Sequence, residues 1–153
     1  MSKFFIFLIV FAFAMPAWAS DWVDGEHVRA RLAAVPDAGN KMAVLEVELE
    51  DGWHSYGQDP GDAGLPPRFE WEGSSNLERA QISWPETFEK REMDMFTVNA
   101  YEGAIQFPLT IIPVDVQGDV ALKLGLKLMV CKDICIPSTL DLALDLKPAW
   151  PAP

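Results

Sequence analysis

Apolar and polar residues alternate along most of this chain with a period of two. The clearest case is the stretch from 119 to 130, where Lys123 and Lys127 fall between regularly spaced apolar residues. Successive side chains of a β-strand point to opposite faces, so this pattern predicts a strand with one buried face. The side chains expected on that face are Val120, Leu122, Leu124, Leu126, Leu128 and Val130.

Four other segments alternate in the same way, and no segment longer than about ten residues has a helical period. Their expected inward sets are Val28, Ala30, Leu32 and Ala34; Ala43, Leu45, Val47 and Leu49; Ile105, Phe107, Leu109 and Ile111; and Leu140, Leu142, Leu144 and Leu146. Shorter strands are expected around Phe69 and Trp71, and around Ile82 and Trp84. Many short strands separated by turn signals predict an all-β protein, an immunoglobulin-like antiparallel β-sandwich.

Two segments interrupt the strand pattern. Residues 56–67 are rich in Gly, Pro and Asp, which predicts a long ordered loop. Residues 147–153 form a Pro-rich tail, and because proline has no backbone N–H to donate, we expect this tail to lie outside the sheets.

The N-terminal segment has the order of a secretory signal peptide. Lys3 precedes an apolar run from Phe4 to Ala14, and Ala17-Trp18-Ala19 then forms a small-x-small cleavage signal. The run is shorter than the roughly 20 residues of a transmembrane helix. We therefore expect residues 1–19 to be a signal peptide cleaved near Ala19/Ser20, residues 20–153 to be a single domain, and the protein to be exported to a compartment where disulfides persist.

Charge and composition exclude several functions. The chain has 153 residues, with 12 Lys plus Arg, 23 Asp plus Glu and a formal net charge of −11. So acidic a protein is not expected to bind nucleic acid, because affinity for phosphates comes from Lys and Arg. Its two cysteines cannot alone supply the four ligands of a structural zinc site, and no phosphate-binding or metalloprotease motif is present. We expect neither a metal nor a cofactor.

The cysteine pair carries the candidate chemistry. Cys131 directly follows the longest predicted strand, and Cys135 lies two residues before Pro137 and the last strand. A disulfide between them closes a ring of only about five residues. Closing so short a ring stabilises a fold by only about 2 kcal/mol, so the bond contributes little to stability. As a redox pair it is better suited, because each sulfur can resolve a mixed disulfide formed by the other.

Three roles for the pair remain open on the residues alone. The first is reversible thiol–disulfide exchange, and the second is a structural disulfide in an adaptor protein. The third is a Cu(I)-binding module of the envelope, since thiolate and thioether ligands suit this ion. The further ligands considered for such a site are Met129, Met93, Met95 and either His54 or His27.

The order of several short motifs resembles the N-terminal periplasmic domain of the thiol:disulfide interchange protein DsbD, and in particular its ScsB-like branch. The likeness extends over roughly residues 25–146. The motifs are Asp51-Gly-Trp-His-Ser-Tyr56, Asp59-Pro-Gly-Asp62, Gly64-Leu-Pro-Pro67, Phe69-Glu-Trp71, Ser83-Trp-Pro-Glu86, Phe107-Pro-Leu109 and Val130-Cys-Lys-Asp-Ile-Cys-Ile-Pro137.

The resemblance implies an immunoglobulin-like domain of the periplasm whose redox pair is Cys131 and Cys135. It implies a thiol–disulfide oxidoreductase that relays electrons from a thioredoxin-like donor to periplasmic disulfide oxidoreductases. By the same likeness, Cys135 forms the mixed disulfide with a partner. The family also has a loop with an aromatic shield over the cysteines; the segment 92–97 corresponds to it, and Met95 or Phe96 is the expected shield.

Two departures from the family pattern change these expectations. The DsbD proteins continue into a membrane domain and a second redox domain, whereas this chain ends at Pro153. We therefore expect its thioredoxin-like and membrane-embedded redox partners to be separate proteins. Ser138 also stands where the branch usually has an acidic residue, which affects the tuning of the pair.

Overall fold

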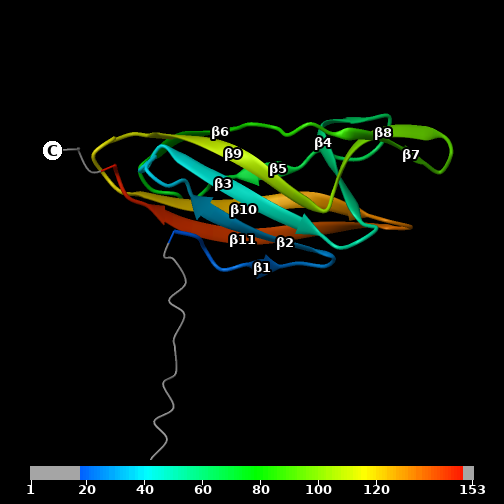
Figure 1. Cartoon of the computed structure of the whole chain (residues 1–153), viewed down its shortest axis with the longest axis horizontal. Coiled ribbons are helices and arrows are strands. Elements are labelled where there is room, and N and C mark those ends of the chain that lie inside the picture. Colours follow the sequence, from blue (N-terminus) through cyan, green and yellow to red (C-terminus); the bar gives the residue numbers. More distant parts are fainter. Residues whose placement is uncertain (1–17, 150–153) are drawn as a thin grey trace, which may run out of the picture.

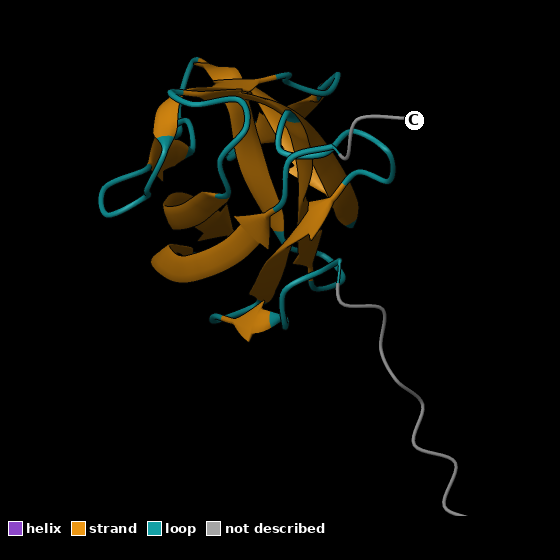
Figure 2. Cartoon of the chain, turned by 90° about the vertical axis from the view of Figure 1, so that its left-hand side faces the viewer, coloured by secondary structure: helices purple, strands orange, loops and turns teal. Residues whose placement is uncertain are grey.

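The computed structural model describes residues 18–149, and all the regular structure in this range is β. The strands form two antiparallel sheets that pack face to face, as predicted (Figures 1 and 2). No helix in the described part of the chain is long and apolar enough to cross a membrane.

The first sheet has five strands. In spatial order they are β1 (Val23–Asp24), β2 (Val28–Ala34), β3 (Met42–Leu49), β9 (Ala104–Pro113) and β6 (Leu77–Ile82).

The second sheet has six strands and carries the cysteines. Its main order is β11 (Cys135–Leu146), β10 (Val120–Cys131), β4 (His54–Gly61), β8 (Phe96–Glu102) and β7 (Phe88–Glu92), and β5 (Arg68–Glu70) also pairs with β10. The β10–β11 hairpin is the longest, with twelve residues in each strand. Its tip lies at the same end of the molecule as the β7–β8 hairpin (Figure 1).

The core between the sheets consists of the side chains that the alternation predicts to point inward. All of these predicted residues are buried except Ala34, which is half-buried while its neighbour Ala33 is buried. The period of two is kept along β10 as far as Val130 and along β11, so these strands have one buried face and one more exposed face. A second, smaller cluster of buried residues lies apart from this core and contains Tyr56, Val98, Ala100 and Cys131.

The prediction of a loop over residues 56–67 is wrong for its first half, because β4 continues to Gly61. The pairing of β4 with β8 shifts register between Tyr56 and Gly61, so extra residues bulge out of the ladder. Backbone groups in the bulge find other partners: Asn99 donates to the Asp59 carbonyl at 3.1 Å, and the Gly61 N–H donates to the Asp59 carboxylate at 3.0 Å. A composition typical of loops is thus accommodated within a strand by a bulge.

Residues 1–17 of the expected signal peptide and residues 150–153 of the Pro-rich tail lie outside the described residues. Of the tail, residues 147–149 are described, and they follow β11 without joining a sheet. At the other end, the chain is held from the expected cleavage point onward, since the Ser20 N–H donates to the Leu32 carbonyl at 2.8 Å.

An aromatic group at one side of the core centres on Phe107. The ring of Phe107 makes edge-to-face contacts with Phe69, Trp84 and Tyr101, at centroid distances of 5.9, 5.7 and 5.5 Å. Edge-to-face pairs stabilise a fold beyond the area that they bury. Phe107 therefore joins strand β9 of the first sheet to Phe69 in β5 and Tyr101 in β8 of the second.

We expect Phe107→Ala to lower the free energy of unfolding by about 3–5 kcal/mol, because it removes a buried ring and leaves a cavity. The measurement is urea denaturation of the oxidised protein. Phe88→Ala is the matched control: this ring is 44% exposed, and its loss should cost less than about 1 kcal/mol. Equal losses in the two variants would contradict this account of the core.

Candidate functional site

The candidate site is a disulfide at the tip of the β10–β11 hairpin. Cys131 is the last residue of β10 and Cys135 the first of β11, and the two face each other directly across the ladder. The turn between them is closed by a hydrogen bond from the Lys132 N–H to the Ile134 carbonyl at 2.9 Å. The Cα atoms lie 4.1 Å apart, slightly below the expected range of about 4.4–6.8 Å. Direct cross-strand neighbours approach to about 4.5 Å, which accounts for the short separation.

The two cysteines differ sharply in exposure to solvent. Cys131 is only 1% exposed, whereas Cys135 is exposed. Cys131 packs in the small cluster with Tyr56, and Phe96 and Met129 pack against this cluster. Of the two cysteines, Cys135 is therefore the one at the surface of the protein.

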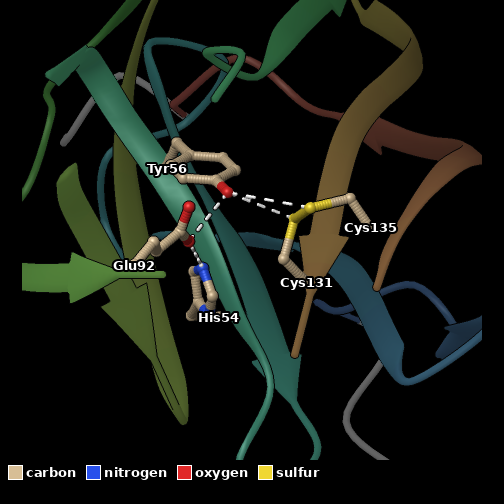
Figure 3. The surroundings of a disulfide bond; sticks show 5 residues. All are labelled: His54, Tyr56, Glu92, Cys131 and Cys135. Atoms are coloured by element: carbon tan, nitrogen blue, oxygen red, sulfur yellow. Dashed lines mark hydrogen bonds and ion pairs between the residues drawn. A yellow bond between two sulfur atoms is a disulfide. The ribbon is translucent and has the colours of Figure 1, made fainter. Parts of the chain in front are cut away.

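Three polar side chains continue from the buried sulfur in a chain of hydrogen bonds (Figure 3). The Tyr56 hydroxyl lies 3.2 Å from the Cys131 sulfur and 3.9 Å from the Cys135 sulfur. The same hydroxyl lies 3.0 Å from Oε1 of Glu92. His54 bonds to this carboxylate oxygen through Nε2.

The environment of Tyr56 keeps its hydroxyl protonated. Burial raises the pKa of the Tyr56 hydroxyl well above its ordinary value, and both the hydrogen bond and the negative charge of Glu92 raise it further. Tyr56 is therefore present as the neutral phenol, with a single proton that two acceptors share.

Strand pairing brings these residues together. His54 is the first residue of β4 and pairs with Cys131 of β10. Tyr56 lies two residues further along, so it points to the same face as His54. Glu92 ends β7, and the two residues after it, Met93 and Asp94, have φ values of 51° and 55°. This left-handed pair is typical of a tight hairpin turn, and it returns the chain into β8 beside the site.

The structure separates the two candidates for the shield. Phe96 packs against the cluster that contains Cys131 and Tyr56. Met95 lies in the turn and is 70% exposed. Of the two, Phe96 is therefore the one that lies beside the buried member of the pair.

The candidate copper ligands are brought together only in part. Met129 packs against the cluster that contains Cys131, and His54 pairs with Cys131 across the ladder. Met93 and Met95 are both exposed in the turn. His27 instead stacks on Trp53, with ring centroids 3.8 Å apart. Over residues 18–149, no group of three or more His, Cys, Asp or Glu residues is arranged to hold a metal ion.

The role of Glu92 and Tyr56 beside the sulfurs is not evident from the sequence. Tyr56 appears there only within a motif, and Glu92 only as the first residue of the predicted shielding segment. The spacing of His54 and Tyr56 does place them on one face of a strand. Their contact with Glu92 depends on the pairing of β4, β7 and β8, which no local pattern specifies.

These features define a class of protein: a β-sandwich domain with a disulfide at the tip of a hairpin, one sulfur exposed and the other buried. The model of the family "Thiol:disulfide interchange protein DsbD, N-terminal" matches residues 19–147. The chain therefore belongs to the family of DsbD N-terminal domains. The comparison with curated proteins found no match.

Solved structures of similar fold include two domains with related names. One is the N-terminal periplasmic domain of ScsB from Proteus mirabilis, with 26% sequence identity and a TM-score of 0.67. The match covers 90% of this chain and 55% of that one, so this chain spans about half its length. The other is the DsbD N-terminal domain of Neisseria meningitidis in the reduced form, with 16% identity, a TM-score of 0.49, and coverage of 84% and 86%.

We expect the two thiols of the reduced protein to differ in their rate of alkylation. In Cys131→Ala the exposed Cys135 should react quickly with iodoacetamide, and in Cys135→Ala the buried Cys131 should react at least about tenfold more slowly. An opening that costs only about 1.4 kcal/mol is enough for that ratio. Mass spectrometry over time measures both rates, with each variant in urea as its own control. Similar rates for the two folded variants would contradict the burial described above.

Proposed function

We propose that this protein is a periplasmic thiol–disulfide interchange protein that relays electrons through Cys131 and Cys135. Its electrons come from a thioredoxin-like donor and pass to periplasmic disulfide oxidoreductases. The observation that carries the proposal is the unequal exposure of the two sulfurs in a domain of the DsbD N-terminal family. The periplasmic location is supported by the expected signal peptide and by the name of the similar ScsB domain.

The exchange follows from the geometry of the pair. A thiolate of the reduced donor attacks the exposed Cys135 sulfur, the bond between Cys135 and Cys131 breaks, and its electron pair moves to the Cys131 sulfur. The donor's second thiolate then attacks its own sulfur in the mixed disulfide and releases Cys135. The donor is oxidised to a disulfide, and this protein gains two electrons and takes up two protons. Reduction of an acceptor disulfide runs through the same steps in reverse.

The surface around the exposed sulfur suits a protein partner. Ile134 lies in the turn next to Cys135 and is exposed, and Met93 and Met95 are exposed at the tip of the neighbouring hairpin. Exposed apolar side chains of this kind are common where another protein docks. Methionine adapts to different partner surfaces, which fits a relay that contacts both a donor and an acceptor.

The first test is trapping of a mixed disulfide. We expect Cys131→Ala to accumulate a stable mixed disulfide with a thioredoxin-like partner, because the thiol that would resolve it is missing. Cys135→Ala should trap little, because its remaining sulfur is buried. Non-reducing gel electrophoresis of the exported variants, with the double variant as control, separates the outcomes. Equal trapping by the two variants, or none by either, would count against the proposal.

The second test is the reduction potential of the pair. Structural disulfides of secreted proteins typically lie below about −300 mV, and interchange proteins lie above this value. We expect the Cys131–Cys135 pair to lie above it, because a ring of about five residues gains little from closure. Equilibration with glutathione or dithiothreitol buffers measures the potential. A value below about −300 mV would favour a structural disulfide, and tight Cu(I) binding without exchange would favour a metal-binding role.

A further inference from the structure

Reduction of the disulfide places a new negative charge where water does not reach. When Cys135 is attacked, the electron pair of the broken bond stays on the Cys131 sulfur, which is buried in the small apolar cluster. Burial in apolar surroundings disfavours a thiolate. A rapid exchange therefore requires a proton at this sulfur, and a buried sulfur needs a protein group to deliver it.

The Tyr56 hydroxyl is the group in position to do so. It lies 3.2 Å from the Cys131 sulfur and is itself buried. Over residues 18–149, it is the one side-chain hydrogen-bond donor found at this sulfur. In the oxidised protein the hydroxyl has a better acceptor in the Glu92 carboxylate, since charged acceptors bind a donor more strongly than a neutral disulfide does. Once Cys131 leaves as a thiolate, it becomes a second charged acceptor for the same proton.

Tyr56 cannot give up this proton without receiving another. Burial and the adjacent negative charge raise the pKa of the Tyr56 hydroxyl, so a tyrosinate beside the Glu92 carboxylate is strongly disfavoured. Glu92 is the neighbour that can supply the replacement, because its side chain is 19% exposed and so reaches solvent. It contacts the Tyr56 hydroxyl at 3.0 Å.

His54 holds this carboxylate in place. Its Nε2 bonds to the same Glu92 oxygen that contacts Tyr56. Its Nδ1 is buried without a partner among the described residues, and an unpaired N–H there would be costly. The single ring proton of a neutral His54 therefore belongs on Nε2, where it is donated to Glu92.

We infer that Tyr56 is the catalytic proton donor to the leaving sulfur of Cys131, and that Glu92, positioned by His54, passes a proton from solvent to Tyr56. During reduction, the Glu92 carboxylate takes up a proton from solvent and passes it to Tyr56 as the proton of Tyr56 moves to the Cys131 thiolate, so that Tyr56 ends as the phenol and Glu92 as the carboxylate. During oxidation the path reverses: Cys131 loses its proton to Tyr56 and becomes the thiolate that attacks the Cys135 sulfur in the mixed disulfide. This inference rests on the proposed interchange function and adds the route of its proton.

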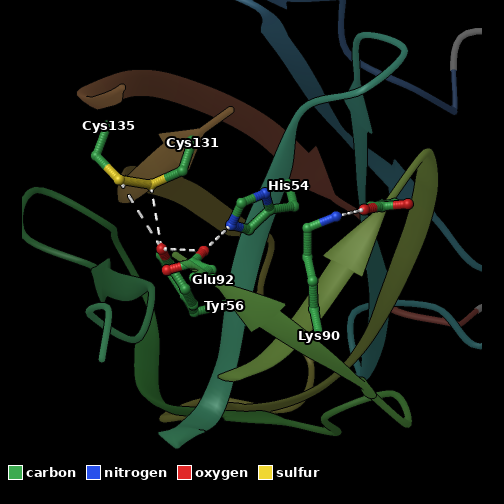
Figure 4. A network of polar contacts seen from close by, with 7 residues as sticks. His54, Tyr56, Lys90, Glu92, Cys131 and Cys135 are labelled. Carbon is green, nitrogen blue, oxygen red and sulfur yellow. Dashed lines mark hydrogen bonds and ion pairs between the residues drawn. A yellow bond between two sulfur atoms is a disulfide. The ribbon is translucent and has the colours of Figure 1, made fainter. Parts of the chain in front are cut away.

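Other charged groups near the site are already engaged with one another. Lys90 and Glu102, on β7 and β8, pair at 2.9 Å (Figure 4). Glu102 is also the ladder partner of His54. Strand β8 faces Tyr56 with the uncharged side chains of Val98 and Ala100, and Lys132 and Asp133 in the cysteine turn are exposed. The titratable groups that directly contact the hydrogen-bonded chain are thus His54, Glu92 and the two cysteines.

The experiment measures the rate of reduction of the full oxidised protein by dithiothreitol, at equal concentrations of the attacking thiolate. We expect Tyr56→Phe and Glu92→Gln each to slow reduction about 100-fold, within the usual range for loss of a general acid. His54→Gln should slow it less, because Glu92 loses its orientation but its carboxylate can still carry a proton. Tyr101→Phe is the matched control, since that buried hydroxyl donates to the Pro85 carbonyl at 2.7 Å, away from the sulfurs, and its rate should be unchanged.

A second readout separates proton delivery from damage to the fold. In the Cys135→Ala background, ultraviolet absorbance of the thiolate gives the pKa of Cys131. Tyr56→Phe should raise this pKa, because the thiolate loses its donor. Glu92→Gln should lower it, because a competing negative charge is removed. Water entering a damaged site would instead lower the pKa and speed reduction in both variants.

The outcomes distinguish this inference from the proposed function. Wild-type rates in Tyr56→Phe would overturn the role of Tyr56, and wild-type rates in Glu92→Gln would overturn that of Glu92. Because dithiothreitol replaces the partner, the proton route is tested even if no thioredoxin-like protein exchanges with this one. The wild-type protein could fail to exchange with any thioredoxin-like protein while both substitutions still slow its reduction by dithiothreitol. That result would refute the proposed function and leave the proton route standing.

Discussion

The register of β10 between its neighbours is the constraint on which the rest of the structure depends. Its inward side chains form the centre of the core, and its last residue, Cys131, pairs with Cys135 on one side and with His54 on the other. Because side chains alternate between the faces, a shift of one residue would expose the apolar face and turn Cys131 away from Tyr56. The stability of the sandwich and the position of the redox pair are therefore fixed by the same pairing.

This pairing also explains why the two sulfurs differ. Cys131 is still part of the ladder and lies under the small cluster of Tyr56, Val98 and Ala100, whereas Cys135 begins the outer strand of the sheet and is exposed. In the proposed exchange, the disulfide thus presents Cys135 to the partner and keeps Cys131 away from water. The leaving sulfur of Cys131 is then far from water. We infer that the hydrogen-bonded chain of Tyr56, Glu92 and His54 supplies its proton.

The β7–β8 hairpin contributes both to the packing around Cys131 and to the hydrogen-bonded chain beside it. Phe96 packs against the cluster over Cys131, while Glu92, at the other side of the same turn, contacts Tyr56 and His54. One short turn, with Met93 and Asp94 in the left-handed region, therefore places an aromatic ring against the cluster that contains Cys131 and a carboxylate against Tyr56. Substitutions that alter this turn should affect both the cover over Cys131 and its proton supply.

The sequence by itself determined the long alternating strands, their inward faces and the cysteine turn, because a period of two and a short loop are local properties of the chain. It also carried the family motifs, which the match over residues 19–147 bears out. Only the tertiary structure decided that β4 continues through a bulge to Gly61, that Phe96 rather than Met95 packs against the cluster containing Cys131, and that Glu92 contacts Tyr56. These depend on pairing between strands distant in sequence, and residues 36 positions apart share no local pattern that could reveal their contact.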